Sequence, residues 1–187
     1  MNLDYKLFAI INSIAGHNNI LDMFMLGMAK YGVILYALIL AFLWFKQGNA
    51  NKKVALKAVT AALFALAINQ AIGLFYFRPR PFVHHDVNML IDKSPDPSFP
   101  SDHATGSAAL TFSILGTNRL LGIFMTILTG ILMISRVYVG THYPFDVIGG
   151  AAIGYLGSMI SSFLWSKIDN VADNIIKIYN KFIPAGM

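Results

Sequence analysis

Long apolar runs separated by short polar stretches dominate the chain. Four runs are long enough to cross a bilayer core, which takes about 20 apolar residues in a helix; they cover residues 20–45, 53–77, 120–140 and 147–165. The first run contains Lys30 and Gly32, where the helix can break, and the second begins with lysines whose side chains can reach the interface. A fifth run, 104–116, spans only about 20 Å as a helix. The pattern predicts an all-α integral membrane bundle of about five to six transmembrane helices.

The two ends of the chain have different patterns. Residues 1–18 place five aliphatic side chains on one helical face, namely Leu3, Leu7, Ile10, Ile11 and Ile14. Such a stripe predicts a helix that lies in the membrane interface, with a sixth partial span as the alternative. Residues 169–187 are polar and periodic, which predicts a surface tail. Because we find no internal repeat, we expect residues 1–187 to form a single membrane-embedded domain.

Composition agrees with a membrane protein. Hydrophobic residues make up 56% of the chain and charged residues only 12%, about half the share typical of soluble domains. The chain has no cysteine, which excludes disulfides and thiolate metal sites. The net charge of +5 comes from scattered basic residues rather than a basic stripe, so we do not expect nucleic-acid binding. The first residues include Asp4 and have no A-x-A site, so we expect no cleaved signal peptide.

Lysine and arginine predict the orientation. One side of the expected spans carries eight basic residues, namely Lys46, Lys52, Lys53, Lys57, Arg119, Lys167, Lys177 and Lys181. The other side carries five, namely Lys6, Arg78, Arg80, Lys93 and Arg136. Since the more basic side is normally cytoplasmic, we expect the proline-rich loop 79–100 and the turn after Arg136 to face outward together. Two loops on one side of the membrane can build one site.

Three polar clusters lie on that outer side: FRPRPF (77–82), PSDH (100–103) and SRVYVGTHYPFD (135–146). Ionisable residues at membrane depth are costly, which makes them functional candidates. His142 precedes Asp146 by four residues at the start of an expected helix. The carboxylate can therefore fix the imidazole tautomer and leave the other ring nitrogen free as a nucleophile. Taken alone, the pair is explained equally well by helix capping and complementation of the helix dipole.

The PSDH cluster stands just before the short apolar run. Ser101 can cap a helix that starts near Asp102, and the free N–H groups of a helix N-terminus bind phosphate readily. His103 would then lie beside a bound anion, where it can donate a proton to a leaving oxygen. Capping explains Ser101 alone better, and an interfacial histidine explains His103 alone. Arg80 and Arg136 add forked donors suited to phosphate, although a lone arginine more often reaches lipid headgroups.

In order and spacing, these clusters resemble the type-2 phosphatidic acid phosphatase superfamily. Its signature reads K-x6-R-P, then P-S-G-H, then S-R-x5-H-x3-D. Nine positions of this chain match it, namely Arg80, Pro81, Pro100, Ser101, His103, Ser135, Arg136, His142 and Asp146. The matches extend over residues 80–146, and the helical framework extends the resemblance over most of the chain.

Two positions depart from the signature. Gly73 stands where the family has its lysine, so one phosphate contact is missing and Arg78 is the candidate to replace it. Asp102 stands where the family usually has glycine. A carboxylate there is unfavourable beside a phosphate unless it points away or pairs with Arg78 or Arg80. With the small size and the YFRPRPF and FPSDH segments, these departures resemble the bacitracin-resistance type of undecaprenyl-pyrophosphate phosphatase.

The resemblance implies a role for each residue. His142 attacks the terminal phosphorus and forms a phosphohistidine, Asp146 holds His142, and His103 protonates the leaving oxygen before water releases the enzyme. The phosphoryl oxygens are held by Arg80, Ser101, Arg136 and the backbone of Asp102, with Arg78 as the replacement for the lysine. The superfamily mechanism is metal-independent, so the resemblance implies no metal and no cofactor.

The expected function is therefore a bacterial plasma-membrane phosphatase with its site facing outside. It would convert undecaprenyl pyrophosphate to the monophosphate and so recycle the lipid carrier of cell-wall (peptidoglycan) synthesis. Its expected partners are the lipid-linked pyrophosphate and membrane lipids, while the sequence does not reveal protein partners. The alternative substrates are phosphatidylglycerophosphate and phosphatidic acid. The alternative of another class is a phospholipid transporter or scramblase, which needs the two arginines but no His142–Asp146 pair. A vanadate-dependent peroxidase shares the signature, but a membrane-embedded chain of this size argues against it.

Overall fold

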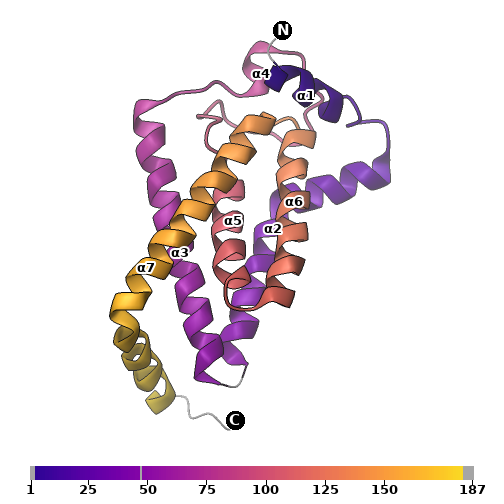
Figure 1. Cartoon of the computed structure of the whole chain (residues 1–187). Coiled ribbons are helices and arrows are strands. Elements are labelled where there is room, and N and C mark those ends of the chain that lie inside the picture. Colours follow the sequence, from indigo (N-terminus) through magenta and orange to yellow (C-terminus); the bar gives the residue numbers. More distant parts are fainter. Residues whose placement is uncertain (1–2, 47, 183–187) are drawn as a thin grey trace.

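The computed structural model describes residues 3–46 and 48–182, except for the side chain of residue 169, and the described residues form helices and loops without a strand (Figure 1). The helices are α1 (Leu3–Asn12), α2 (Asn19–Phe45), α3 (Asn49–Phe75), α4 (Pro81–His84), α5 (Asp102–Leu115), α6 (Arg119–Tyr138) and α7 (Pro144–Phe182). The predicted all-α architecture is confirmed.

Four of the described helices are long and apolar enough to cross a membrane: α2, α3, α6 and residues 144–168 of α7. The short apolar run is α5, whose 14 residues pack against α3, α6 and α7 inside the bundle. Helix α2 continues unbroken through Lys30 and Gly32. Gly32 is buried there because α6 packs closely against it, with Leu132 as the nearest side chain.

Close packing of α7 fixes the start of α5. A Cβ atom on Gly154 would lie 2.6 Å from the carbonyl oxygen of Thr105, and one on Gly150 would lie 2.8 Å from that of Ser101. On Gly157 it would lie 2.6 Å from the Cβ of Ala65 in α3. Real Cβ atoms do not approach other atoms so closely, so only glycine allows these backbones to meet. The glycine spacing thus sets the position of the first turn of α5.

Helix α1 lies across one end of the bundle, at the top of Figure 1. Its buried residues are Asp4, Phe8 and Asn12, whereas most of the predicted aliphatic stripe is exposed. Asn12 binds the loop beside the bundle: its Nδ2 donates to the carbonyl oxygens of Tyr138 (2.8 Å) and Asn88 (3.0 Å). The polar side chains Asp4 and Asn12 therefore face protein, and most of the stripe is left exposed. A position in the membrane interface stays a prediction.

The C-terminal part of α7 is helical to Phe182. The helix bends at Ile168, whose φ of −124° and ψ of 28° are not helical. Beyond the bend, Ala172 and Ile176 are buried, and Asp173 forms an ion pair with Lys53 at 2.9 Å. The described part of the predicted tail thus packs back against the bundle, while residues 183–187 lie outside the described residues.

Candidate active site

His142 lies in the turn between α6 and α7 and is buried. Its Nδ1 is 2.8 Å from the carbonyl oxygen of Ser98, and its Nε2 is 3.1 Å from NH1 of Arg80. A carbonyl oxygen only accepts hydrogen bonds, so Nδ1 carries the proton and Nε2 keeps its lone pair. The arrangement therefore presents Nε2 of His142 as a nucleophile beside a fixed cation.

Asp146, in the first turn of α7, supports His142 mainly through other groups. Its Oδ2 is 3.8 Å from Nδ1 of His142, which is too long for a hydrogen bond. The same oxygen accepts from the backbone N–H of Tyr143 at 2.8 Å and from the hydroxyl of Ser98. Asp146 thus fixes the turn that carries His142. It also fixes Ser98, whose carbonyl oxygen accepts from the imidazole. The direct contact suggested by the four-residue spacing is therefore an ion-pair contact at 3.8 Å, and these hydrogen bonds add indirect support.

Ser98 is a functional candidate that sequence reasoning missed. It is fully buried, and its backbone N–H donates to the carbonyl oxygen of Arg78 at 2.8 Å. The residue therefore links Asp146, His142 and the arginine segment. Nothing in the segment SPDPSFPSDH distinguishes this serine from its neighbours, because its role depends on a tertiary contact.

Ser101 and Arg136 offer hydrogen-bond donors without partners. Ser101 is the residue before α5, yet its hydroxyl does not cap the helix, and its Oγ is buried with no hydrogen bond. Arg136 is buried in the last turn of α6; its NH1 donates to the carbonyl oxygen of Ala29 at 2.8 Å, but its Nε has no partner. A buried polar atom without a partner costs about 1–3 kcal/mol. Capping by Ser101 is thus not found, and both donors suit an anion.

Arg80 is anchored from the proline-rich loop. Its Nε and NH2 donate to the carboxylate of Asp96 at 3.2 and 3.0 Å, and NH1 donates to the carbonyl oxygen of Thr141 at 2.8 Å. These bonds hold the guanidinium against His142. Asp96 is a second residue that sequence reasoning missed, since an aspartate between two prolines reads as a turn residue.

Arg78, the candidate to replace the missing lysine, lies between two carboxylates. Its NH1 lies 2.6 Å from Oδ1 of Asp146 and its NH2 lies 2.6 Å from Oδ2 of Asp4, while its Cζ is 4.2 Å from the ring centroid of Tyr143. Both carboxylates are buried and need a cation. The guanidinium of Arg78 is therefore engaged by Asp4 and Asp146, and its contact with a phosphate stays a prediction.

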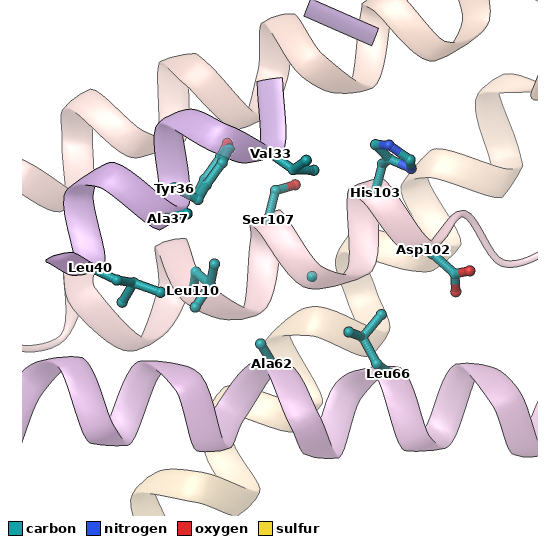
Figure 2. Close-up of a pocket in the computed structure, with 11 residues that line it drawn as sticks. Val33, Tyr36, Ala37, Leu40, Ala62, Leu66, Asp102, His103, Ser107 and Leu110 are labelled. Atoms are coloured by element: carbon teal, nitrogen blue, oxygen red, sulfur yellow. The ribbon is translucent and has the colours of Figure 1, made fainter. Parts of the chain in front are cut away.

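Asp102 points away from the site. Its Oδ1 accepts from Nδ2 of Asn69 in α3 at 2.8 Å, and Oδ1 of Asn69 accepts from the hydroxyl of Thr105 at 3.0 Å. Figure 2 shows the Asp102 and His103 side chains directed to different sides of α5. The unfavourable carboxylate is therefore removed from the phosphate site. Its backbone N–H stays in the first turn of α5, as the expected role of that backbone requires.

His103 stands at one end of an apolar cavity. The cavity, of about 390 Å³, lies between α2, α3 and α5 (Figure 2). Its apolar lining includes Val33, Leu40, Leu66 and Leu110. The imidazole of His103 thus adjoins a space suited to hydrocarbon.

Both site histidines have lowered pKa values, and His103 is expected to gain a proton when an anion binds. Burial, Asp146 and the neighbouring Arg80 and Arg136 together give His142 a pKa of about 4, with burial the largest cause. Burial and then Arg136 lower the pKa of His103 to about 4 as well. A bound phosphate favours imidazolium, so it raises the pKa of His103 and supplies the protonated donor.

We therefore expect His103 to titrate well below pH 6.5 in the empty protein and at a higher pH with an anion bound. Imidazole ¹⁵N NMR with and without vanadate measures both values, and His103→Asn assigns the signal. A pKa of His103 that stays the same when vanadate binds would contradict the role of His103 as donor to a bound phosphate.

Comparisons with known proteins identify the family of this chain. A model of the PAP2 superfamily matches residues 54–168. The chain is 36% identical to the Bacillus subtilis (strain 168) protein named undecaprenyl-diphosphatase BcrC, over 97% of this chain and 94% of that protein. It is 28% identical to the Escherichia coli (strain K12) protein named putative undecaprenyl-diphosphatase YbjG, over 89% and 85% of the two chains. The crystal structure of Aquifex aeolicus LpxE superimposes with a TM-score of 0.74 at 26% identity, over 86% of this chain and 95% of that one.

Proposed function

The chain belongs to the PAP2 superfamily, and from that premise we propose that this multi-pass membrane protein hydrolyses undecaprenyl diphosphate to undecaprenyl phosphate and phosphate. The observation that carries the proposal is the buried Nε2 of His142, unprotonated and 3.1 Å from Arg80. The unpartnered donors of Ser101 and Arg136 supply the anion site that such a nucleophile requires.

The reaction follows from these positions. The lone pair of His142 Nε2 forms a bond to the terminal phosphorus, and the bond from that phosphorus to the bridging oxygen breaks. His103 gives its proton to the bridging oxygen, which leaves with the lipid phosphate. Water then attacks the phosphohistidine, gives a proton to His103 and releases phosphate. Phosphoryl transfer mainly needs positioning and charge neutralisation, which Arg80 and Arg136 provide.

The lipid part of the proposal rests on two supports. The cavity beside His103 is lined mainly by apolar side chains, so it suits the hydrocarbon next to a phosphorylated headgroup. The relative with 36% identity carries the name undecaprenyl-diphosphatase. Basic residues are more numerous at the end of the bundle away from the site, which favours a site on the outer face of a bacterial plasma membrane.

A substrate panel tests the function. We expect the purified protein in detergent to release phosphate from undecaprenyl diphosphate with EDTA present, and with a kcat/KM at least about 10-fold higher than on phosphatidylglycerophosphate or phosphatidic acid, a difference of about 1.4 kcal/mol. A preference for either phospholipid would replace the proposed substrate. Movement of lipid across liposomes without release of phosphate would favour the transporter or scramblase.

A further inference from the structure

A cation outside the family signature lies beside the site. Gly73 leaves the lysine position of the signature empty of charge, and Arg78 is engaged by Asp4 and Asp146. Lys93, in the loop between α4 and α5, has its Nζ 3.2 Å from Oδ2 of Asp96. The same oxygen is 3.0 Å from NH2 of Arg80. One carboxylate oxygen therefore bridges Lys93 and Arg80, as a phosphate oxygen can.

The ammonium of Lys93 also lies within electrostatic reach of the proton donor. After burial, Arg136 and His142, the next contribution that lowers the pKa of His103 comes from Lys93, ahead of that from Arg80. The charge of Lys93 therefore acts on His103, the group that donates a proton in the proposed reaction.

The net positive charge of the site depends on Lys93. In the ion pairs that link the described residues around Arg78 and Arg80, three cations meet three carboxylates, namely Arg78, Arg80 and Lys93 with Asp4, Asp96 and Asp146. These charges compensate one another, and Arg136 adds its charge beside them through a bond to a neutral carbonyl. Removing Lys93 would cancel this net positive charge. The loss would weaken the binding of a diphosphate more than that of a monophosphate, because the diphosphate carries more negative charge.

We propose that Lys93 is a specificity-determining residue that binds the phosphate attached to the lipid, the leaving group of a diphosphate. The terminal phosphate lies on Arg80, Ser101 and Arg136, while an N–H of Lys93 contacts an oxygen of the second phosphate. As the bridging oxygen takes up electrons and a proton from His103, Lys93 offsets the charge that remains on the leaving phosphate. This inference rests on the proposed function, because only a diphosphate has a second phosphate.

Lys93→Met tests the inference. We expect kcat/KM on undecaprenyl diphosphate to fall about 10- to 100-fold, the usual effect of losing a hydrogen bond to a charged group. The rate on phosphatidic acid should change less than about 3-fold. Lys93→Arg should keep most of the activity on the diphosphate. Lys6→Met is the matched control, because Lys6 is an exposed lysine on α1 at the same end of the bundle.

The outcomes separate this inference from the function. Suppose that the wild type cleaves undecaprenyl diphosphate. If Lys93→Met cleaves it equally well, or if its kcat/KM falls to the same extent on undecaprenyl diphosphate and on phosphatidic acid, the inference is wrong and the proposed function is unaffected. If the wild type fails on undecaprenyl diphosphate, the function is wrong. The role of Lys93 is then tested by measuring how strongly inorganic pyrophosphate and phosphate inhibit the hydrolysis of phosphatidic acid. The inference requires Lys93→Met to weaken inhibition by pyrophosphate and not by phosphate. Equal inhibition of the wild type and the variant by pyrophosphate overturns it.

Discussion

His142→Ala is expected to lower kcat by about 10⁴-fold or more, the scale seen when a covalent nucleophile is removed. The imidazole whose Nε2 lies 3.1 Å from Arg80 and forms the bond to phosphorus is absent from this variant. Rapid quenching of the wild type with ³²P-labelled substrate should trap an acid-labile, base-stable phosphoprotein. The variant should form none.

A matched control and a contrary result make this test specific. His17→Ala removes an exposed histidine between α1 and α2 and should leave the rate unchanged. The variant should still bind vanadate, because the phosphate contacts belong to other residues. Phosphate release by His142→Ala at the rate of the wild type would contradict the nucleophile assignment.

Arg78→Met is expected to lower both stability and kcat. The guanidinium lies between the carboxylates of Asp4 and Asp146, at 2.6 Å from each. Breaking a buried ion pair typically costs about 3–5 kcal/mol, because the remaining charge has no partner. Arg78 itself is 21% exposed, so solvent screening favours the lower end of that range. Displacement of Asp146 also disturbs the turn that carries His142, so we expect a loss of about 100-fold or more in kcat.

Thermal unfolding in detergent and steady-state kinetics measure the two effects of Arg78→Met. Adding Asp4→Asn should restore part of the stability, since it removes one uncompensated charge. Arg78→Lys should restore little of the stability or of kcat, because one ammonium cannot bind two carboxylates as the forked guanidinium does. If Arg78 bound phosphate instead, Arg78→Met would keep its stability and lose affinity for vanadate. That result would contradict the position described for Arg78.

Periodicity predicted the helices that are long and apolar enough to span a membrane, and spacing predicted that His142 lies near Asp146. Apolar runs determine helices at membrane depth wherever lipid is the solvent, and the turn before α7 brings His142 near Asp146 within four residues. Partners distant in the chain were not predictable. Asp4 meets Arg78 across 74 positions, and Ser98 meets Asp146 across 48. For α1, periodicity identified the aliphatic stripe, whereas the buried side chains are Asp4, Phe8 and Asn12.

The ion pair between Asp4 and Arg78 also extends the boundary of the catalytic unit. The PAP2 match begins at residue 54, yet the buried carboxylate of Asp4 lies on α1 and its Oδ1 accepts from the backbone N–H of Phe145 at 2.9 Å. A fragment cut to the family match would lose this support for the loop beside His142. Expression variants should therefore keep the first helix intact and carry affinity tags after α7, whose end at Phe182 lies at the far end of the bundle from α1 (Figure 1).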